Sequence, residues 1–454
     1  TENHGYPFAE IKLDSVQILD DQISASLNLS KHRFIRIDSI RVLGDVALSR
    51  SYLRAYLDLQ EGQAYNEAAI SAISNRIREL PFLRELKPPE ILFNGDVASI
   101  GLFLEEVNAS AFDFLIGVLP NSEITGKLTI TGEGSLELRN AFGAGEGLAL
   151  DFRQLQLGTK EFEVRVDYPY LPLLPFGAQF DFELYLRDSS YLDRRTDFGL
   201  TYLFGGNDII KGYVENKRTV ILSYDTAEIL QSRSLPANLD VLTNRYGLEY
   251  RIERLDYRFN PRKGYALTFG GSGGTRKILT NESVLSLNDP TEPDFEFSSL
   301  YDSLDLKTAS FTLDLGIDLF QPIGRQSVIH FGISGGWIYG GQLFTNELYR
   351  LGGARSLRGF DEESIFASLY QISTLEYRFL IGQNSLFYLF GDLAYLEEKS
   401  NEKNRVDWPF GFGAGMNFET GAGIFGLSYA LGRQQGNPIE FRAAKIHFGY
   451  VNRF

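Results

Sequence analysis

From residue 112 to the end of the chain, apolar and polar residues alternate in one segment after another, and this period of two constrains the fold most. In residues 127–139, Leu and Ile occupy one face, and Thr, Glu and Arg occupy the other. Neighbouring side chains of a strand point to opposite faces, so each segment predicts a β-strand with one apolar face. The same pattern occurs in residues 161–168, 180–187, 245–253, 311–319 and 445–454.

The apolar face is rich in aromatic residues, since the chain has 35 Phe and 24 Tyr among its 454 residues. The opposite face carries charges of both signs, and we predict no helices to cover either face after residue 112. One interpretation is a large soluble β-protein that buries its apolar faces. The other is a membrane barrel, in which strands of about ten residues turn them to lipid. About sixteen such segments lie between residues 112 and 454, so we predict a mostly β fold with a sixteen-stranded transmembrane β-barrel.

Composition excludes several classes of site. No run of about 18 apolar residues is present, which argues against a transmembrane helix. The chain has no Cys, which excludes disulfides, thiolate metal sites and a Cys nucleophile. Its 4 His are scattered, so we predict no metal site and no cofactor. The net charge of −15 disfavours nucleic acid as a partner. No signal peptide is visible, and we expect any targeting sequence to lie upstream.

The first 108 residues have a different, α+β character. We predict two short strands within 9–29 around a turn at Asp20-Asp21. Ser49 is a suitable N-cap for the first of two predicted helices. The predicted order is a strand at 34–42, helices at 49–59 and 66–80, and strands at 90–93 and 98–107.

In the region after residue 112, we expect the longest loops to be extracellular. These loops are 226–243, 273–307 and 339–365.

Residues 33–108 resemble a POTRA domain, a periplasmic polypeptide-transport module, and residues 1–32 resemble the C-terminal part of a preceding POTRA domain. The whole chain resembles the BamA/TamA superfamily of outer-membrane insertases and translocases, with the barrel at 109–454. The features that carry the POTRA resemblance are Ile40-Arg41-Val42-Leu43-Gly44, Leu53, Leu57, Gly62, Tyr65-Asn66 and Leu80-Pro81-Phe82.

The most specific element of the resemblance is Arg358-Gly359-Phe360, which is similar to the family signature on a loop that folds back into the barrel lumen, here at about 339–365. The resemblance implies that Arg358 pairs with Glu376 and Asp392. Alternation supports this, because both carboxylates fall on inward positions. A guanidinium in a narrow lumen needs carboxylate partners, and a bidentate pair fixes its orientation. Gly359 suits a tight turn beside it.

The chain ends in a segment that resembles the family's terminal barrel-assembly signal, with Phe448, Gly449 and Phe454, although the spacing after the glycine departs from the family pattern. Asp361-Glu362-Glu363 could bind Ca²⁺, but we favour a solvated surface. Gly332 to Gly336 matches a hydrolase motif around Ser334, yet it lies in an alternating segment and lacks the strand-to-helix turn that this chemistry needs. Gly411, Gly413 and Gly415 alternate with larger residues, and we interpret them as room for the folded-in loop or a strand bend rather than as a dinucleotide site.

The resemblance implies protein insertion or translocation in the bacterial outer membrane, with the POTRA region in the periplasm and no catalytic residues. The expected partners are outer-membrane lipid, client outer-membrane or exported proteins, and periplasmic or lipoprotein accessory subunits. We expect the route to be a seam between the first strand, near 112–119, and the last, near 440–454, because this pair closes the ring with the shortest partner available. Two alternatives stay open: a passive transport or secretion pore, and a structural or accessory barrel that has lost insertase activity.

Overall fold

The computed structural model describes most of the chain and divides it into two compact units, which we treat separately. The first comprises Thr1–Ala109 together with Arg139–Glu146 and Tyr168–Pro175. The second comprises Ser110–Leu138, Gly147–Asp167 and Phe176–Phe454. The described residues are 1–19, 22–119, 128–156, 158–171, 174–204, 208–257, 259–289, 292–401, 403–434 and 439–453.

A three-stranded sheet with helices packed on one face forms the body of the first unit. The sheet order is β3-β5-β4, with β3 parallel and β4 antiparallel to the central strand. Inward residues of β5 and of the helices share one apolar core, in which Ile100, Leu104, Leu57 and Ile77 have no exposed surface. The elements are β3 (Arg36–Leu43), α1 (Arg50–Leu57), α2 (Glu67–Ser71), α3 (Ile73–Glu79), β4 (Leu83–Asn94) and β5 (Val97–Glu106).

Local capping explains where the helices begin. The Ser49 hydroxyl accepts a hydrogen bond from the backbone N–H of Tyr52 at 3.1 Å, which confirms it as the predicted N-cap of α1. The single helix predicted over 66–80 is wrong in one respect, because the structure divides it into α2 and α3. Ala72, at φ −80° and ψ −14°, separates the two. The buried apolar positions of both helices still face the sheet.

Strand β4 is longer than the strand predicted at 90–93, because it begins at Leu83. This longer strand includes Pro88 and Pro89, and proline cannot donate to a sheet ladder. The structure accommodates them at an irregularity in the register between Lys87 and Glu90. Strand β4 also lies at the edge of its sheet, where a missing N–H is tolerated.

A separate two-stranded hairpin, β1 (Glu10–Leu19) and β2 (Gln22–Ser30), follows the short 3-10 helix η1 (Glu2–His4). Its two strands match the prediction, while the Asp20-Asp21 turn lies outside the described residues. Unlike β5, the hairpin buries neither face. Its apolar side chains are exposed on both strands: Ile11, Leu13, Val16, Ile18, Ile23, Leu27 and Leu29.

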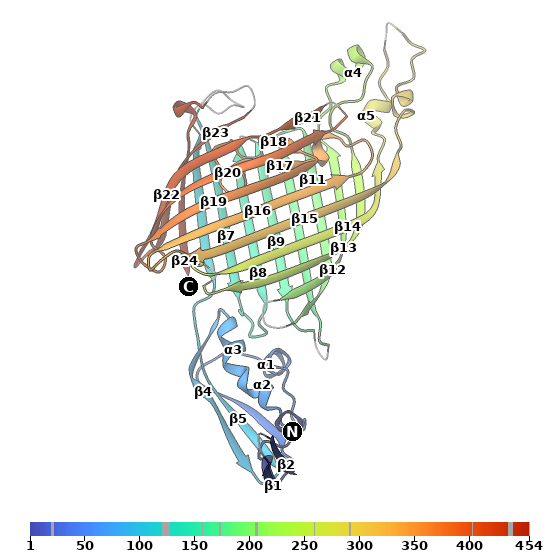
Figure 1. Cartoon of the computed structure of the whole chain (residues 1–454). Helices are drawn as coiled ribbons and strands as arrows, with labels where there is room; N and C mark the ends of the chain where they lie inside the picture. The colour runs from blue at the N-terminus through green and yellow to red at the C-terminus, as the bar shows by residue number, and fades with distance from the viewer. Residues whose placement is uncertain are drawn as a thin grey trace. The chain divides into compact units, whose positions relative to one another are not determined.

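The second unit is a closed antiparallel barrel of tilted strands (Figure 1). Within the described residues it has sixteen strands, counting β21 and β22 as two pieces of one strand that both pair with β20. The strands are β6 (Ala111–Leu119), β7 (Thr129–Arg139), β8 (Gly147–Gln156), β9 (Thr159–Tyr168), β10 (Gly177–Arg187), β11 (Tyr191–Leu203), β12 (Ile209–Ile221), β13 (Val241–Leu255), β14 (Gly264–Ile278), β15 (Lys307–Pro322), β16 (Ser327–Tyr339), β19 (Leu369–Leu380), β20 (Leu386–Lys399), β21 (Asn404–Asp407), β22 (Phe410–Thr420), β23 (Gly423–Arg433) and β24 (Lys445–Arg453).

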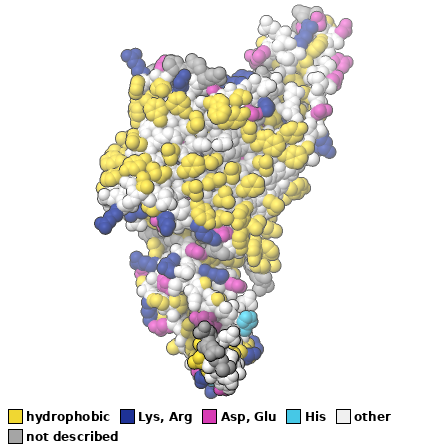
Figure 2. All heavy atoms as spheres, in the orientation of Figure 1, with side chains coloured by type: hydrophobic (Ala, Val, Ile, Leu, Met, Phe, Trp, Pro, Cys, Tyr) yellow, Lys and Arg dark blue, Asp and Glu magenta, His cyan; other side chains and the backbone are white. Residues whose placement is uncertain are grey.

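The predicted alternation sets the two faces of the barrel wall. On β20, Phe387, Leu389 and Leu393 point outward and are about half exposed, whereas Asp392 points inward and is buried. Figure 2 shows the result as a broad band of hydrophobic side chains over the barrel strands. This arrangement suits a wall that meets lipid outside and polar groups inside. None of the helices in the described part of the chain is long and apolar enough to cross a membrane.

The long loops differ in extent from the prediction. Residues 273–278 belong to β14 and 241–243 to β13, because the ladder between these two strands continues through the glycines up to Ile278. The loops between strands therefore cover 222–240, 279–306 and 340–368. They contain α4 (Thr226–Ser232), α5 (Glu282–Leu285), η2 (Phe297–Tyr301), η3 (Thr345–Glu347), β17 (Tyr349–Leu351) and β18 (Ile365–Ala367), whereas η4 (Phe441–Ala443) precedes β24.

Loops 222–240 and 279–306 pack together beyond one end of the barrel, where Figure 1 shows α4 and α5. Their contact is a small apolar core that includes Ile229, Val284 and Phe297. The carboxylate of Asp240 joins the two loops, since it accepts hydrogen bonds from the Tyr224 hydroxyl at 2.5 Å and from the Asn281 amide at 2.7 Å. Burial and the Asp240 carboxylate raise the pKa of Tyr224, so the hydroxyl remains a donor over the physiological range.

Candidate functional site

The loop between β16 and β19, residues 340–368, reaches the inner face of the barrel and brings the three residues of the predicted pair together. The Nε and Nη2 atoms of Arg358 each lie 2.7 Å from one carboxylate oxygen of Asp392. Its Nη1 donates to Glu376 at 2.9 Å. Glu376 comes from β19 and Asp392 from β20, so one guanidinium connects the loop to two adjacent strands.

The surroundings of Arg358 fix its position further. The guanidinium carbon lies 3.5 Å from the centre of the Phe390 ring, within cation–π range. Both carboxylates have a second donor: Thr374 for Asp392 at 2.9 Å and Arg378 for Glu376 at 2.6 Å. Each carboxylate is buried. Loss of the arginine would therefore leave the buried Asp392 carboxylate without its cationic partner, while Glu376 would keep Arg378.

The backbone around Arg358 lies against a wall of glycines. A Cβ added to Gly411 of β22 would come within 1.8 Å of the Arg358 carbonyl oxygen, and one on Gly432 of β23 within 2.6 Å of the Gly359 carbonyl oxygen. Gly359 has a φ of +95°, which an L side chain would strain. Phe360 beside it is buried in an apolar cluster of the loop and the strands. Gly411 therefore makes room for the loop, as interpreted from the sequence.

Loop residues that the sequence prediction missed pair with charged residues on the last strand of the barrel, β24, and on its first two strands, β6 and β7. Asp361 pairs with Lys445 of β24, and each of these two side chains is only 1% exposed. Glu362 lies 3.7 Å from His447 on the same strand. The interpretation of Asp361-Glu362-Glu363 as a solvated surface is therefore wrong. The signal that could have found the contact is the inward parity of positions 445 and 447 in the last strand.

On the other side, Arg355 connects the loop to the first two strands of the barrel. Its Nε lies 2.7 Å from Glu133 of β7, and its Nη2 lies 4.0 Å from Asp113 of β6. A cavity of about 300 Å³ separates this part of the loop from the inner face of β6 and β24. The cavity is lined by Arg355, Arg358, Asp113, Leu115, His447 and Gly449, among others.

Strands β6 and β24 close the barrel through eight residue pairs, from Ile446↔Val118 to Arg453↔Ala111. We call this pair the seam. Strands β6 and β24 have 9 residues each, fewer than the other complete barrel strands that the structure describes. The neighbouring ladder between β23 and β24 is one residue pair shorter than the seam, with seven pairs.

The residues of the predicted terminal signal lie on β24 as far as the structure describes them. Phe448 points outward, with its ring centre 6.4 Å from that of Phe114 on β6. Gly449 faces the cavity behind the seam and pairs with Leu115. Phe454 lies outside the described residues.

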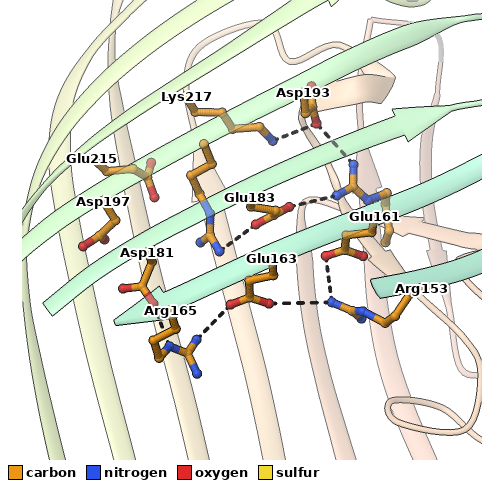
Figure 3. A network of polar contacts seen from close by, with 12 residues as sticks. Arg153, Glu161, Glu163, Arg165, Asp181, Glu183, Asp193, Asp197, Glu215 and Lys217 are labelled. Carbon is orange, nitrogen blue, oxygen red and sulfur yellow. Dashed lines mark hydrogen bonds and ion pairs between the residues drawn. The ribbon is translucent and has the colours of Figure 1, made fainter. Parts of the chain in front are cut away.

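A second set of inward charges braces β8 to β12 (Figure 3). Positive and negative side chains alternate across neighbouring strands, so that most of them contact two partners. Lys211, for instance, lies 3.0 Å from both Asp181 and Asp197. Arg350 of the loop joins this network at Asp193. Further pairs include Arg153–Glu161 at 2.7 Å, Arg153–Glu163 at 3.9 Å, Arg165–Glu163 at 2.9 Å, Arg165–Asp181 at 2.6 Å, Arg195–Glu183 at 2.7 Å, Lys217–Asp193 at 3.4 Å and Arg350–Glu183 at 3.8 Å.

Comparison with known families identifies this architecture. The Omp85 superfamily domain matches residues 140–454, and the POTRA family, described as a surface antigen variable number repeat, matches residues 35–102. The chain belongs to the Omp85 superfamily. This confirms the predicted BamA/TamA-type family and fold class. Membership makes the protein a transport or assembly factor rather than an enzyme, with an outer-membrane barrel and a periplasmic POTRA region.

Three solved structures share the fold of this chain. BamA from Haemophilus ducreyi lacking POTRA domains 1-3 aligns with a TM-score of 0.55 at 16% identity, over 99% of this chain and 91% of that chain. CdiB from Acinetobacter baumannii gives 0.63 at 13% identity, over 99% and 79%. CdiB from Escherichia coli gives 0.59 at 14% identity, over 100% and 82%. A comparison with curated proteins gave no match.

The other motifs weighed in the sequence have structural places. Ser334 lies within β16, so the strand-to-helix turn of a hydrolase nucleophile does not occur there. Gly413 and Gly415 lie within β22, under the rings of Phe390 and Tyr388 respectively. Among the described residues, no group of three or more His, Asp and Glu side chains is arranged to hold a metal ion.

Proposed function

We propose that this Omp85 protein inserts or translocates client proteins at the outer membrane, and that the seam between β6 and β24 is the route. Family membership supports the general function. One observation carries the choice of route: β6 and β24 pair although they stand at opposite ends of the barrel sequence. The other neighbouring barrel strands follow one another along the chain.

This connectivity matters physically because a hairpin connection holds two strands close together even when their hydrogen bonds break. The seam lacks such a connection, so its strands can separate without straining a turn. Separation exposes the N–H and C=O groups of two strand edges, and such edges accept an incoming strand by β-augmentation. A client strand is therefore the natural occupant of the open seam.

The experiment is to lock the seam. Val118→Cys and Ile446→Cys occupy a registered pair, and the native chain has no cysteine to interfere. The matched control, Leu319→Cys with Phe331→Cys, locks β15 to β16, which the chain already holds as a hairpin. Folding of a urea-denatured eight-stranded barrel protein into proteoliposomes containing each variant gives the activity.

We expect oxidation to abolish activity in the seam variant and reduction to restore it, whereas the control is active in both states. Equal activity of the oxidised and reduced seam variant would exclude the seam. It would favour transport through the lumen or a barrel that has lost the insertase role.

We also propose that Arg358, Gly359 and Phe360, with Glu376 and Asp392, anchor loop 340–368 inside the barrel. Four hydrogen bonds from Arg358, one of them from its backbone N–H, support this role. The anchored loop fills part of the lumen, which disfavours the passive-pore alternative. Accessory subunits remain a proposal from the family alone.

Finally, we propose that residues 1–32 are the C-terminal part of a preceding POTRA domain. The hairpin β1–β2 has the strand order of β4–β5, but its apolar side chains are exposed where those of β5 are buried. Helices of the preceding domain would cover this face. The test is hydrogen exchange of residues 10–30 in the full natural protein: protection as strong as that of β5 supports the proposal, and rapid exchange contradicts it.

A further inference from the structure

Loop 340–368 contacts the barrel strands on both sides of the seam. Asp361 and Glu362 meet Lys445 and His447 of β24. Six residues before Asp361, Arg355 meets Glu133 of β7 and approaches Asp113 of β6. A single short segment, 355–362, therefore spans the inner side of the only barrel pair among the described strands that joins the two ends of the barrel sequence.

The contact with β24 is the most deeply buried part of this arrangement. Lys445 is among the largest fully buried side chains of the described residues, and Asp361 is its ion-pair partner. Removing one partner of a buried pair leaves an uncompensated charge, which is strongly unfavourable. Strand β24 therefore cannot move away from the loop unless Lys445 reaches water or another anion.

The loop itself is tied to strands well away from the seam. Glu347 of the loop accepts two hydrogen bonds from Arg276 of β14, both 2.6 Å long. Arg350 contacts Asp193 of β11, and Arg358 holds the loop to β19 and β20. Because these anchors lie on strands that hairpins connect, the loop cannot simply follow β24 outward.

We propose that segment 355–362 is an internal strap that keeps the seam closed, so that the seam opens only when the Asp361–Lys445 and Arg355–Glu133 pairs break. The importance of the strap for activity rests on the proposed function. Its existence does not, because closure of the seam can be measured without any client protein.

The measurement is amide hydrogen exchange of the whole protein in lipid nanodiscs, followed on peptides from β6, β24 and, as an internal reference, β15. Asp361→Asn and Lys445→Met each remove one charge of the buried pair. We expect exchange of β24 and β6 to accelerate at least tenfold in both variants, with β15 unchanged. Restoring the pair in reverse, as Asp361→Lys with Lys445→Asp, should recover part of the protection.

Lys211→Met is the matched control. Like Lys445, Lys211 is a buried lysine that pairs with carboxylates, but it lies on β12, away from the seam. It should leave exchange of β24 at the native rate. If Lys445→Met does not fold, Arg355→Gln provides the test, since the Arg355 side chain is half exposed and its loss is tolerable for folding.

Native exchange of β24 in Asp361→Asn and Arg355→Gln would overturn the strap, and so would equal acceleration in Lys211→Met. These outcomes differ from failure of the proposed function. If the disulfide-locked seam stays active while exchange of β24 still responds to the strap variants, the strap exists but the seam is not the route.

Discussion

Two parts of the barrel wall hold their strands together in different ways. We call the part formed by β10 to β15 the charged wall, and the part formed by β22, β23, β24 and β6 the glycine wall. Strands β10 to β15 have 11 to 16 residues, and ion pairs between inward side chains connect those from β10 to β13. Strands β22, β23, β24 and β6 have 11, 11, 9 and 9 residues. Glycines line part of their inner face, and a loop covers it.

The two walls therefore differ in what holds each strand in place. In the charged wall, each strand is held by a long ladder and by side chains that have several partners, so loss of one contact leaves others. In the glycine wall, the glycines let the loop backbone approach the strands closely, so we expect the stability of this wall to depend on the loop. We therefore expect the charged wall to be the more rigid side of the barrel and the glycine wall to be rigid only while the loop is in place.

Arg358→Ala should have the largest effect, because it unfastens the loop from Glu376 and Asp392. We expect a loss of about 3–5 kcal/mol in the free energy of unfolding, the usual result of leaving a buried charge unpaired, because Asp392 loses its cationic partner although Glu376 keeps Arg378. Arg358→Lys should recover only part of it, since the planar fork is lost. Urea unfolding in detergent gives the stability, and limited proteolysis of loop 340–368 reports whether the loop stays inside. A native proteolysis pattern in Arg358→Ala would contradict the role of Arg358 in holding the loop against the glycine wall.

Gly411→Ala should have a smaller effect, of about 1–3 kcal/mol, because the added methyl group collides with the Arg358 carbonyl and pushes the loop backbone away. The control is Gly391→Ala on the adjacent strand β20, where a Cβ meets nothing within 4 Å. Thermal unfolding by heat-dependent gel mobility compares the two. If both variants lose the same stability, tight packing of the loop on glycine is not what supports this wall.

Arg165→Gln on β9, whose side chain pairs with Asp181 of the charged wall, should have the smallest effect, about 0–1 kcal/mol, although it removes contacts with both Glu163 and Asp181. Asp181 keeps Lys211, and Glu163 keeps Arg153 at 3.9 Å. The same urea unfolding measurement applies. A loss as large as that of Arg358→Ala would show that the charged wall lacks the redundancy described above.

The sequence was sufficient for the fold because alternation depends only on neighbouring residues. It gave the barrel, the inward parity of Glu376 and Asp392, and, with the family resemblance, their pairing with Arg358. It did not reveal that Asp361 is buried, because its burial depends on a strand far away in the sequence. The ion pairs of the charged wall were missed for a related reason: parity shows that Lys211 and Asp181 face inward, but only strand register makes them partners.

A client protein that is stalled during assembly can show whether its strand meets the protein at the seam. A single cysteine is placed outward on β6, as Ile116→Cys, or on β15, as Leu319→Cys, and a barrel client with a cysteine in its last strand is stalled during assembly. We predict a mixed disulfide with position 116 and none with position 319. No disulfide at position 116, or equal yields at both positions, would contradict it.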